Sequence, residues 1–194
     1  MSNRLTFREG RKVYLRPVLK SDVDLLTRWF NDPVVGKYTR TRGPLQPAAI
    51  EERTIGPSKI DRHAFIIVLK GASAEEDIPI GWMNIFDIDF VNGTATTGAG
   101  IGEKVHWNKG YGTEAKMLLL DFAFNRLNLR KIYSKTYSFN KRSRRYSEKC
   151  GYRLEAILKK HHCCDGRLFD ELTLSVYADR WRKLWEKRKR TFLP

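Results

Sequence analysis

The sequence predicts a single domain of the mixed α/β class, with a twisted mixed sheet of about seven strands and helices on both of its faces. Three observations predict it. The length of 194 residues suits one domain with a substantial core. Segments with the two-residue period of strands alternate with segments that have the 3.6-residue period of helices. No internal repeat or low-complexity linker interrupts them, so residues 1–194 are assigned to one domain.

The N-terminal part of the chain predicts a strand followed by a helix. Residues 12–16 alternate as a half-buried strand does, and Pro17 ends the run. Ser21 is the expected N-cap of the helix, with the acidic Asp24 three residues later. Apolar residues then recur at helical spacing, and the turn-forming residues 31–33 end the helix.

The next stretch predicts a long loop and then three strands. Glycines and prolines recur over residues 34–62, which indicates a loop with short helices, the second near residues 47–54. Two apolar runs, 64–69 and 78–86, flank a polar insert and predict a hairpin. A further strand is expected over residues 95–103.

The second half of the chain predicts three helices and three strands. The expected elements are a helix over 112–127, a strand over 131–136, a helix over 141–149 closed by Gly151, a hairpin of strands near 152–161 and 169–177, and a basic helix over 178–190.

The net charge of the chain is strongly positive. Thirty-seven Lys and Arg residues against 22 Asp and Glu give +15 at pH 7, and a field of this size attracts anions. A phosphate-rich cofactor, nucleic acid and an acidic protein are all compatible with it. So is a basic surface that serves only solubility.

The sequence predicts neither a membrane protein nor an exported one. No apolar run approaches the length that crosses a bilayer, and residues 1–4 lead into no signal-peptide core. Cys163 and Cys164 are neighbours and the count of three cysteines is odd, which favours reduced thiols. The cytoplasm is the expected location, and both a monomer and a homodimer stay open.

A glycine-rich loop between an expected strand and an expected helix has the pattern of a phosphate site. Its core is Asn108-Lys109-Gly110-Tyr111-Gly112. Glycines lack Cβ atoms, so backbone N–H groups can approach phosphate oxygens, and the helix adds free N–H groups and the positive end of its dipole. Ala115 stands where a dinucleotide-binding loop needs its third glycine, and the Gly-Lys-Ser/Thr of a P-loop is absent.

The wider segment 101–115 resembles the acetyl-CoA motif of the GNAT superfamily of N-acetyltransferases, and in particular its RimJ/RimL-like branch. Segments at 29–33, 140–152 and 165–170 fit the same branch, in order along nearly the whole chain. The resemblance implies a GNAT-like domain that transfers an acetyl group from acetyl-CoA to a primary amine by direct attack on the thioester. The acceptor classes left open are a protein N-terminus, a polyamine, and an amino group of a sugar or antibiotic.

The resemblance also assigns the cofactor contacts. Amides near Gly100, Ile101 and Gly102 would bind the pantetheine arm, and one of them would polarise the thioester carbonyl. Asn140 would hold an amide of the same arm, with Ser143 beside it. The residues assigned to the pyrophosphate loop are Trp107, Asn108, Lys109, Gly110, Tyr111, Gly112 and Thr113.

Three positions depart from the superfamily pattern. Trp107 replaces the common Gln or Arg that opens the loop, and Thr96 stands where an acidic residue is often found. Ser147 stands where many relatives have Tyr, and Tyr146 comes one place early. The usual acid and base therefore do not transfer directly to this chain.

Acetyl transfer needs a group that protonates the leaving thiolate. Ser143, Tyr146 and Ser147 compete for this role, because all three lie on the helix expected after Asn140. Ser143 is preferred since it occupies the serine of the family's Asn-x-x-Ser pattern. A plain N-cap role for the same serine fits the sequence equally well.

Transfer also needs a deprotonated amine. Histidine titrates near neutral pH, so His162 is the preferred base, ahead of His161 and Glu103, and a route through water without a protein base stays open. Only one of the two neighbouring histidines is expected to face the cleft, because side chains alternate along a strand. For the same reason residues 161–164 are not expected to converge on a metal ion.

An RNA-binding or ribosome-associated protein that keeps the fold without turnover is the alternative function. The last helix carries Trp181 and Trp185 four residues apart, which is typical of core contact. The basic residues of that helix are Arg180, Arg182, Lys183, Lys187, Arg188, Lys189 and Arg190.

Overall fold

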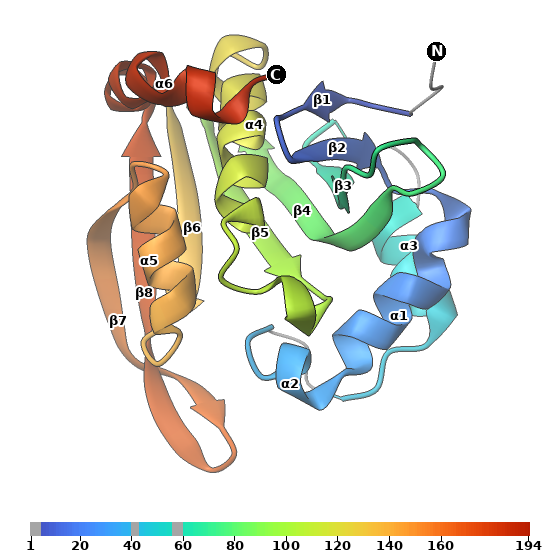
Figure 1. Ribbon diagram of the computed structural model, residues 1–194. Coiled ribbons are helices and arrows are strands. Elements are labelled where there is room, and N and C mark those ends of the chain that lie inside the picture. Colours follow the sequence, from blue (N-terminus) through green and yellow to red (C-terminus); the bar gives the residue numbers. More distant parts are fainter. Residues whose placement is uncertain (1–4, 40–42, 56–59) are drawn as a thin grey trace.

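A computed structural model describes residues 5–39, 43–55 and 60–194, and one eight-stranded sheet forms its centre (Figure 1). The strand order is β1-β2-β3-β4-β5-β6-β8-β7. Only the β5–β6 pair is parallel; every other neighbouring pair is antiparallel. The mixed α/β class is confirmed, with one strand beyond the expected seven. That strand, Arg8–Glu9, is too short to leave a periodic pattern.

The remaining elements follow the expected order. The strands are β1 Arg8–Glu9, β2 Val13–Pro17, β3 His63–Leu69, β4 Ile78–Asp89, β5 Thr94–Ile101, β6 Lys131–Tyr137, β7 Arg153–Cys164 and β8 Arg167–Tyr177. The α-helices are α1 Val23–Asn31, α2 Pro33–Gly36, α3 Pro47–Ile55, α4 Tyr111–Asn125, α5 Lys141–Lys149 and α6 Ala178–Phe192. Short 3-10 helices cover Lys20–Asp22 and Lys104–His106. Of the loop expected over 34–62, residues 40–42 and 56–59 lie outside the described part.

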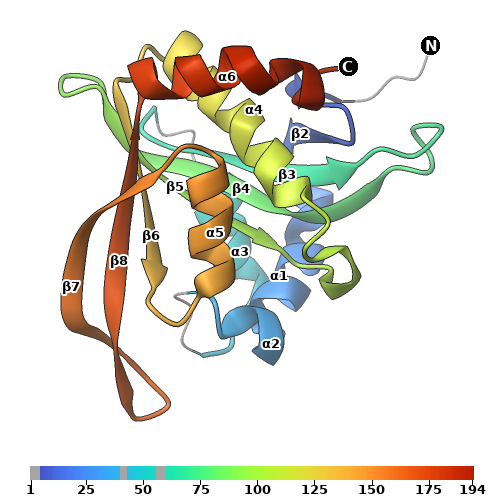
Figure 2. The same ribbon diagram turned by 60° about the vertical axis from the view of Figure 1, so that its left-hand side comes forward.

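The sheet separates two layers of helices and two hydrophobic clusters. Figure 2 shows α4, α5 and α6 on one side of the sheet and α1, α2 and α3 on the other. Along β3, Phe65 and Ile67 join the cluster that contains α4 and α6, whereas Ile66 and Val68 join the cluster that contains α1 and α3. Successive side chains of a strand point to opposite faces, so a continuous apolar run fits a strand that is buried on both sides.

The start of α1 differs from the prediction. Ser21 does not cap the helix; it lies in the 3-10 turn that precedes it. The carboxylate of Asp22 instead accepts the N–H of Leu19 at 2.8 Å. Both terminal nitrogens of Arg16 bind the same carboxylate, at 2.6 and 2.7 Å. Asp22 is the N-cap residue of α1 and makes no side-chain cap hydrogen bond, because its carboxylate binds Leu19 and Arg16 instead.

Two features expected from the cysteine count and the hydropathy of the chain are found. Cys150, Cys163 and Cys164 are all free thiols. Among the described residues, no helix combines the length and the apolar character that crossing a membrane requires.

Helix α4 buries a lysine beneath the sheet. Lys116 is fully buried, and its Nζ donates to Thr97 Oγ1 at 2.6 Å. The rings of Tyr146 and Tyr152 lie 5.5 and 5.6 Å from this nitrogen. Removal from water disfavours the charged amine and lowers the pKa of Lys116 to about 7, while the nearby Cys150 raises it.

Substitution Lys116→Met is expected to change the pH dependence of stability. The unfolded lysine keeps its proton up to its ordinary pKa of 10.5, but the folded one releases it near pH 7. Between these values the unfolded state binds more protons, so the stability of the wild type rises with pH. We expect the variant to be more stable at pH 6, by on the order of 2–5 kcal/mol, and to lose this advantage by pH 10.

Urea denaturation of both proteins at pH 6, 8 and 10 measures the difference. A difference that stays constant over this range would contradict the assignment of Lys116 as a buried, easily deprotonated amine.

Candidate active site

The strands β5 and β6 separate after three paired residues. Thr94, Ala95 and Thr96 pair with residues 131–133, but β5 continues to Ile101 and β6 continues to Tyr137. In the described chain no strand pairs with residues 98–101 on the β6 side. On this edge Ile101 O accepts from Trp107 Nε1 at 2.7 Å, and the other backbone groups that face β6 are available to a ligand.

A cavity of about 820 Å³ occupies this opening. Residues 96–101 of β5 and 134–137 of β6 line it from either side. The start of α4 lines it on one face of the sheet. On the opposite face, Trp82, which belongs to the cluster of α1 and α3, lines it together with Tyr38. The cavity thus passes through the sheet and connects the two faces.

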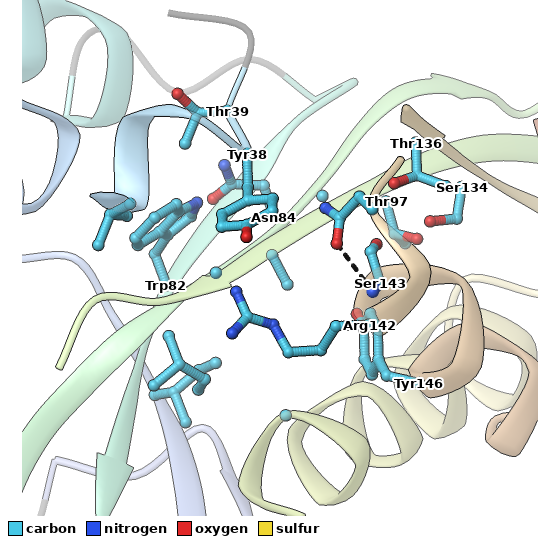
Figure 3. A pocket seen from close by; sticks show the side chains of 18 of the residues that line it. Tyr38, Thr39, Trp82, Asn84, Thr97, Ser134, Thr136, Arg142, Ser143 and Tyr146 are labelled. Atoms are coloured by element: carbon cyan, nitrogen blue, oxygen red, sulfur yellow. Dashed lines mark hydrogen bonds between the residues drawn. The ribbon is translucent and has the colours of Figure 1, made fainter. Parts of the chain in front are cut away.

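Figure 3 shows how polar side chains surround the cavity. Tyr38, Thr39, Trp82 and Asn84 lie on one side of it, and the remaining labelled hydroxyls lie on the other. The guanidinium of Arg142 reaches across the space between the two groups. The hydroxyl-bearing residues of the second group are Thr97, Ser134, Thr136, Ser143 and Tyr146.

The first turn of α4 presents free backbone donors to the cavity. Gly110 is the N-cap, with φ 88°, and its carbonyl accepts from Thr113 N at 3.0 Å and Glu114 N at 3.1 Å. The N–H groups of Tyr111 and Gly112 have no acceptor among the described residues. A Cβ built on Gly110 meets no atom within 4 Å, and one on Gly112 meets only atoms at 4.0 Å. Open space therefore lies over the positive end of the helix dipole.

Positive side chains of α5 also line the cavity. Arg142 Cζ lies 3.7 Å from the centre of the Trp107 ring and 4.9 Å from that of Tyr38. Free N–H groups, a helix dipole and several cations together suit a ligand with more than one phosphate group. The cavity-lining cations of α5 are Lys141, Arg142, Arg145 and Lys149.

Asn140 is the N-cap of α5, so the side chain of Ser143 does not cap this helix. The Oδ1 atom of Asn140 accepts from Ser143 N at 3.1 Å, shown as the dashed line in Figure 3. Because Oδ1 is occupied, the amide nitrogen of Asn140 is left to donate to a ligand carbonyl. The N-cap role that the sequence left open for Ser143 belongs to Asn140, and Ser143 lines the cavity.

The hydroxyl groups of the two other candidate acids, Tyr146 and Ser147, are buried. Tyr146 Oη has no hydrogen-bond partner among the described residues, and burial raises its pKa well above the usual value. Ser147 is fully buried and does not line the cavity. Of the three candidate acids, only Ser143 lines the cavity without a buried hydroxyl.

The structure brings most of the predicted cofactor residues to the cavity, but not Gly102 or Lys109. The N–H of Gly102 donates to Ile80 O at 2.9 Å, and the residue is buried against Trp29. Lys109 is exposed and outside the cavity lining. The predicted residues that line the cavity are Gly100, Ile101, Trp107, Asn108, Gly110, Tyr111, Gly112, Thr113, Asn140 and Ser143.

The three candidate bases do not line the cavity. His162 Nε2 lies 2.9 Å from Oε2 of the buried Glu171, and its ring packs edge-on against Tyr137, which does line the cavity. Glu103 is engaged by α1, since its Oε1 accepts from Arg28 at 2.6 Å and from Trp29 at 2.8 Å. The assignment of His162 as the base stays a prediction.

The expectation that His161 and His162 point to opposite faces is wrong. The register of β7 with β8 shifts between Leu158 and His162, and Lys160 has φ 49°. This irregularity breaks the alternation and brings the two ring centres to 4.8 Å. Donor atoms of both histidines and Glu171 lie within 4.8 Å of one another. The absence of a metal site at these residues therefore stays a prediction, and the alternation of side chains along the strand no longer supports it.

Asp87 is a cavity-lining carboxylate that the sequence pattern did not indicate. It is the one acidic side chain among the described residues that line the cavity. The β4–β5 register shifts between Phe86 and Asp89, and Asp87 has φ 52°. Phe86 pairs with Thr96, the position that lacks the common acidic residue. A bulge on the neighbouring strand thus supplies a carboxylate beside that position, and bulges leave no periodic signal.

Comparisons with known proteins agree with this geometry. The uncharacterized N-acetyltransferase p20 of Bacillus licheniformis is 29% identical over 169 residues, which cover 85% of this chain and 92% of that protein. The structure of spermidine N-acetyltransferase from Vibrio cholerae in complex with CoA and spermine matches with a TM-score of 0.78 at 21% identity, over 88% of this chain and 98% of that one. A GNAT-family acetyltransferase from Bacillus anthracis gives 0.75 at 22% identity, over 89% and 99%.

The model of the acetyltransferase (GNAT) domain family matches residues 12–153, which is most of the chain. The chain belongs to the GNAT family of acetyltransferases.

Proposed function

We propose that this enzyme transfers the acetyl group of acetyl-CoA to a primary amine by direct attack on the thioester, as a member of the RimJ/RimL-like branch. One observation carries the proposal: the opening between β5 and β6 meets the free N–H groups of α4 in one cavity. An extended amide-bearing arm ending in phosphates fits both parts, because strand edges bind amides and helix N-termini bind phosphates.

Each part of the cavity has a proposed role toward acetyl-CoA. The N–H groups of Tyr111 and Gly112 bind the pyrophosphate, and the cations of α5 balance its charge. The open edge of β5 at residues 98–101 binds the arm, and the amide nitrogen of Asn140 donates to one of its carbonyls. The bound thioester supplies an activated acetyl group next to Ser143.

The acceptor amine is proposed to enter from the face of α1 and α3. Tyr38, Thr39 and Asn84 lie with Trp82 on that side of the cavity, and Asp87 also lines the cavity. The net charge of +15 disfavours a polycation at long range. A protein N-terminus or an uncharged amino compound therefore fits this chain better than a polyamine does.

The proposed chemistry has one bond-forming and one bond-breaking step. The amine nitrogen bonds to the carbonyl carbon, the C–S bond breaks, and Ser143 donates a proton to the leaving sulfur and regains one from water. The amine loses its own proton to Asp87, to His162 or to water. Asp87 lines the cavity, whereas the ring of His162 contacts the cavity-lining Tyr137.

The RNA-binding alternative gains no support from the last helix. Trp181 and Trp185 are buried and stack on each other with ring centres 5.1 Å apart. They belong to the cluster of α4 and α6, so they are core contacts, as their spacing predicted, and present no surface on which bases stack.

Substitution Gly112→Val is expected to prevent binding of CoA. The added methyl groups occupy the open space over the first turn of α4, where the phosphates are proposed to lie. Because a Cβ at this position meets no described atom closer than 4.0 Å, the fold is expected to survive. Calorimetric titration with CoA is expected to show affinity weakened by about 100-fold or more.

Gly36→Ala is the matched control, since a Cβ there meets only Phe30 O at an ordinary 3.4 Å. This variant should bind CoA as the wild type does. Normal affinity in the Gly112→Val protein, confirmed to be folded, would refute the phosphate site.

The acid and the base are distinguished by three further variants. We expect Ser143→Ala to lower kcat by roughly 10²-fold. Asp87→Asn and His162→Ala each remove one candidate base. The variant that removes the true base is expected to lower turnover between pH 6 and 8, while its affinity for CoA stays unchanged. Steady-state rates on a panel of primary amines provide the measurement. Full activity of both variants would show that water alone takes the proton.

A further inference from the structure

The separation of β5 and β6 coincides with a buried threonine. Thr97 is the first residue of β5 beyond the paired segment, and its Oγ1 donates to Tyr133 O at 3.1 Å. Tyr133 is the last residue of β6 that pairs with β5. A side-chain hydroxyl thus satisfies a strand carbonyl at the point where strand pairing stops.

The remaining hydrogen-bonding capacity of Thr97 is also used. A hydroxyl has one donor and two acceptor positions. Donation to Tyr133 O leaves two acceptor positions, which Lys116 Nζ at 2.6 Å and Tyr152 Oη at 3.1 Å can fill. Thr97, Lys116 and Tyr152 are 3, 0 and 2% exposed. The threonine is therefore held in one orientation by groups on the α4 side of the sheet.

The buried position of Lys116 is energetically unfavourable for an amine. Burial of an amine costs free energy that an apolar side chain of similar length avoids. The groups that face the amine are Thr97, the rings of Tyr146 and Tyr152, and Cys150, with no carboxylate among its described contacts. What the amine contributes, and an apolar side chain lacks, is a directed hydrogen bond to Thr97.

We propose that Lys116 is a positioning residue of the cofactor-arm site: through Thr97 it holds β5 in the separated position that leaves the edge of residues 98–101 open. This inference rests on the proposed function, in which that edge binds the pantetheine arm. Lys116 does not line the cavity and touches no substrate; it acts through the threonine.

Two isosteric variants and one conservative variant test the inference. Lys116→Met and Thr97→Val each remove one partner of the hydrogen bond. Each is expected to weaken CoA binding and raise the KM for acetyl-CoA about tenfold, with kcat changed less than twofold. Thr97→Ser keeps the hydroxyl and is expected to retain the wild-type values. The double variant is expected to lose no more than Thr97→Val alone, because that substitution already removes the hydrogen bond from Lys116.

Lys131→Met is the matched control. Lys131 is a second buried lysine, 7% exposed, and its Nζ donates to Glu155 at 2.6 Å. It lies at the paired end of β6 and does not line the cavity. Losing this partner is expected to reduce stability while CoA affinity stays at the wild-type value.

The outcomes distinguish a failure of the proposed function from a failure of the inference about Lys116. A wild type that binds no CoA overturns both the proposed function and this inference. A wild type that binds CoA, together with Lys116→Met and Thr97→Val proteins of unchanged affinity, overturns the inference alone. Equal weakening in the Lys131→Met protein would also overturn it, since it would reduce the effect to a general loss of stability.

Discussion

The interruption of strand pairing between β5 and β6 is the constraint on which the rest of the structure depends. A central pair of strands ordinarily satisfies its backbone groups by a continuous ladder, and here the ladder stops after Tyr133. The carbonyl of Tyr133 is satisfied by Thr97, whereas the edge of residues 98–101 stays open. An open strand edge can bind an amide-bearing arm, so the sheet itself provides this binding site without an added loop or domain.

In the proposed mechanism the same interruption separates the two substrates. The α4 and α5 face carries the free N–H groups and a row of cations, which suit the phosphates of the cofactor. The α1 and α3 face carries hydroxyl and amide groups, which suit an amine. The opening connects the two faces, so in the proposed mechanism the thioester and the amine meet where the sheet is split. The two ligands then avoid competing for one surface.

The sequence predicted what local patterns encode. The period of the apolar residues located α4, and the glycines before it indicated the loop that lines the cavity, because both are properties of consecutive residues. Asp87 and the approach of His161 to His162 escaped prediction, since each depends on a register shift in a strand. The start of α1 escaped for a related reason, because Arg16, which binds the carboxylate of the N-cap residue Asp22, comes from the preceding strand. The role of Thr97 likewise depends on contacts from α4 and β6 that no local pattern reveals.

A crystal structure of the wild-type enzyme with CoA tests the central claim most directly. The account predicts the pyrophosphate within hydrogen-bond distance of the N–H groups of Tyr111 and Gly112. It predicts the arm between β5 and β6, with the sulfur beside Ser143. A complex in which CoA lies elsewhere, or in which β5 and β6 pair along their whole length beside an unoccupied cavity, would contradict it.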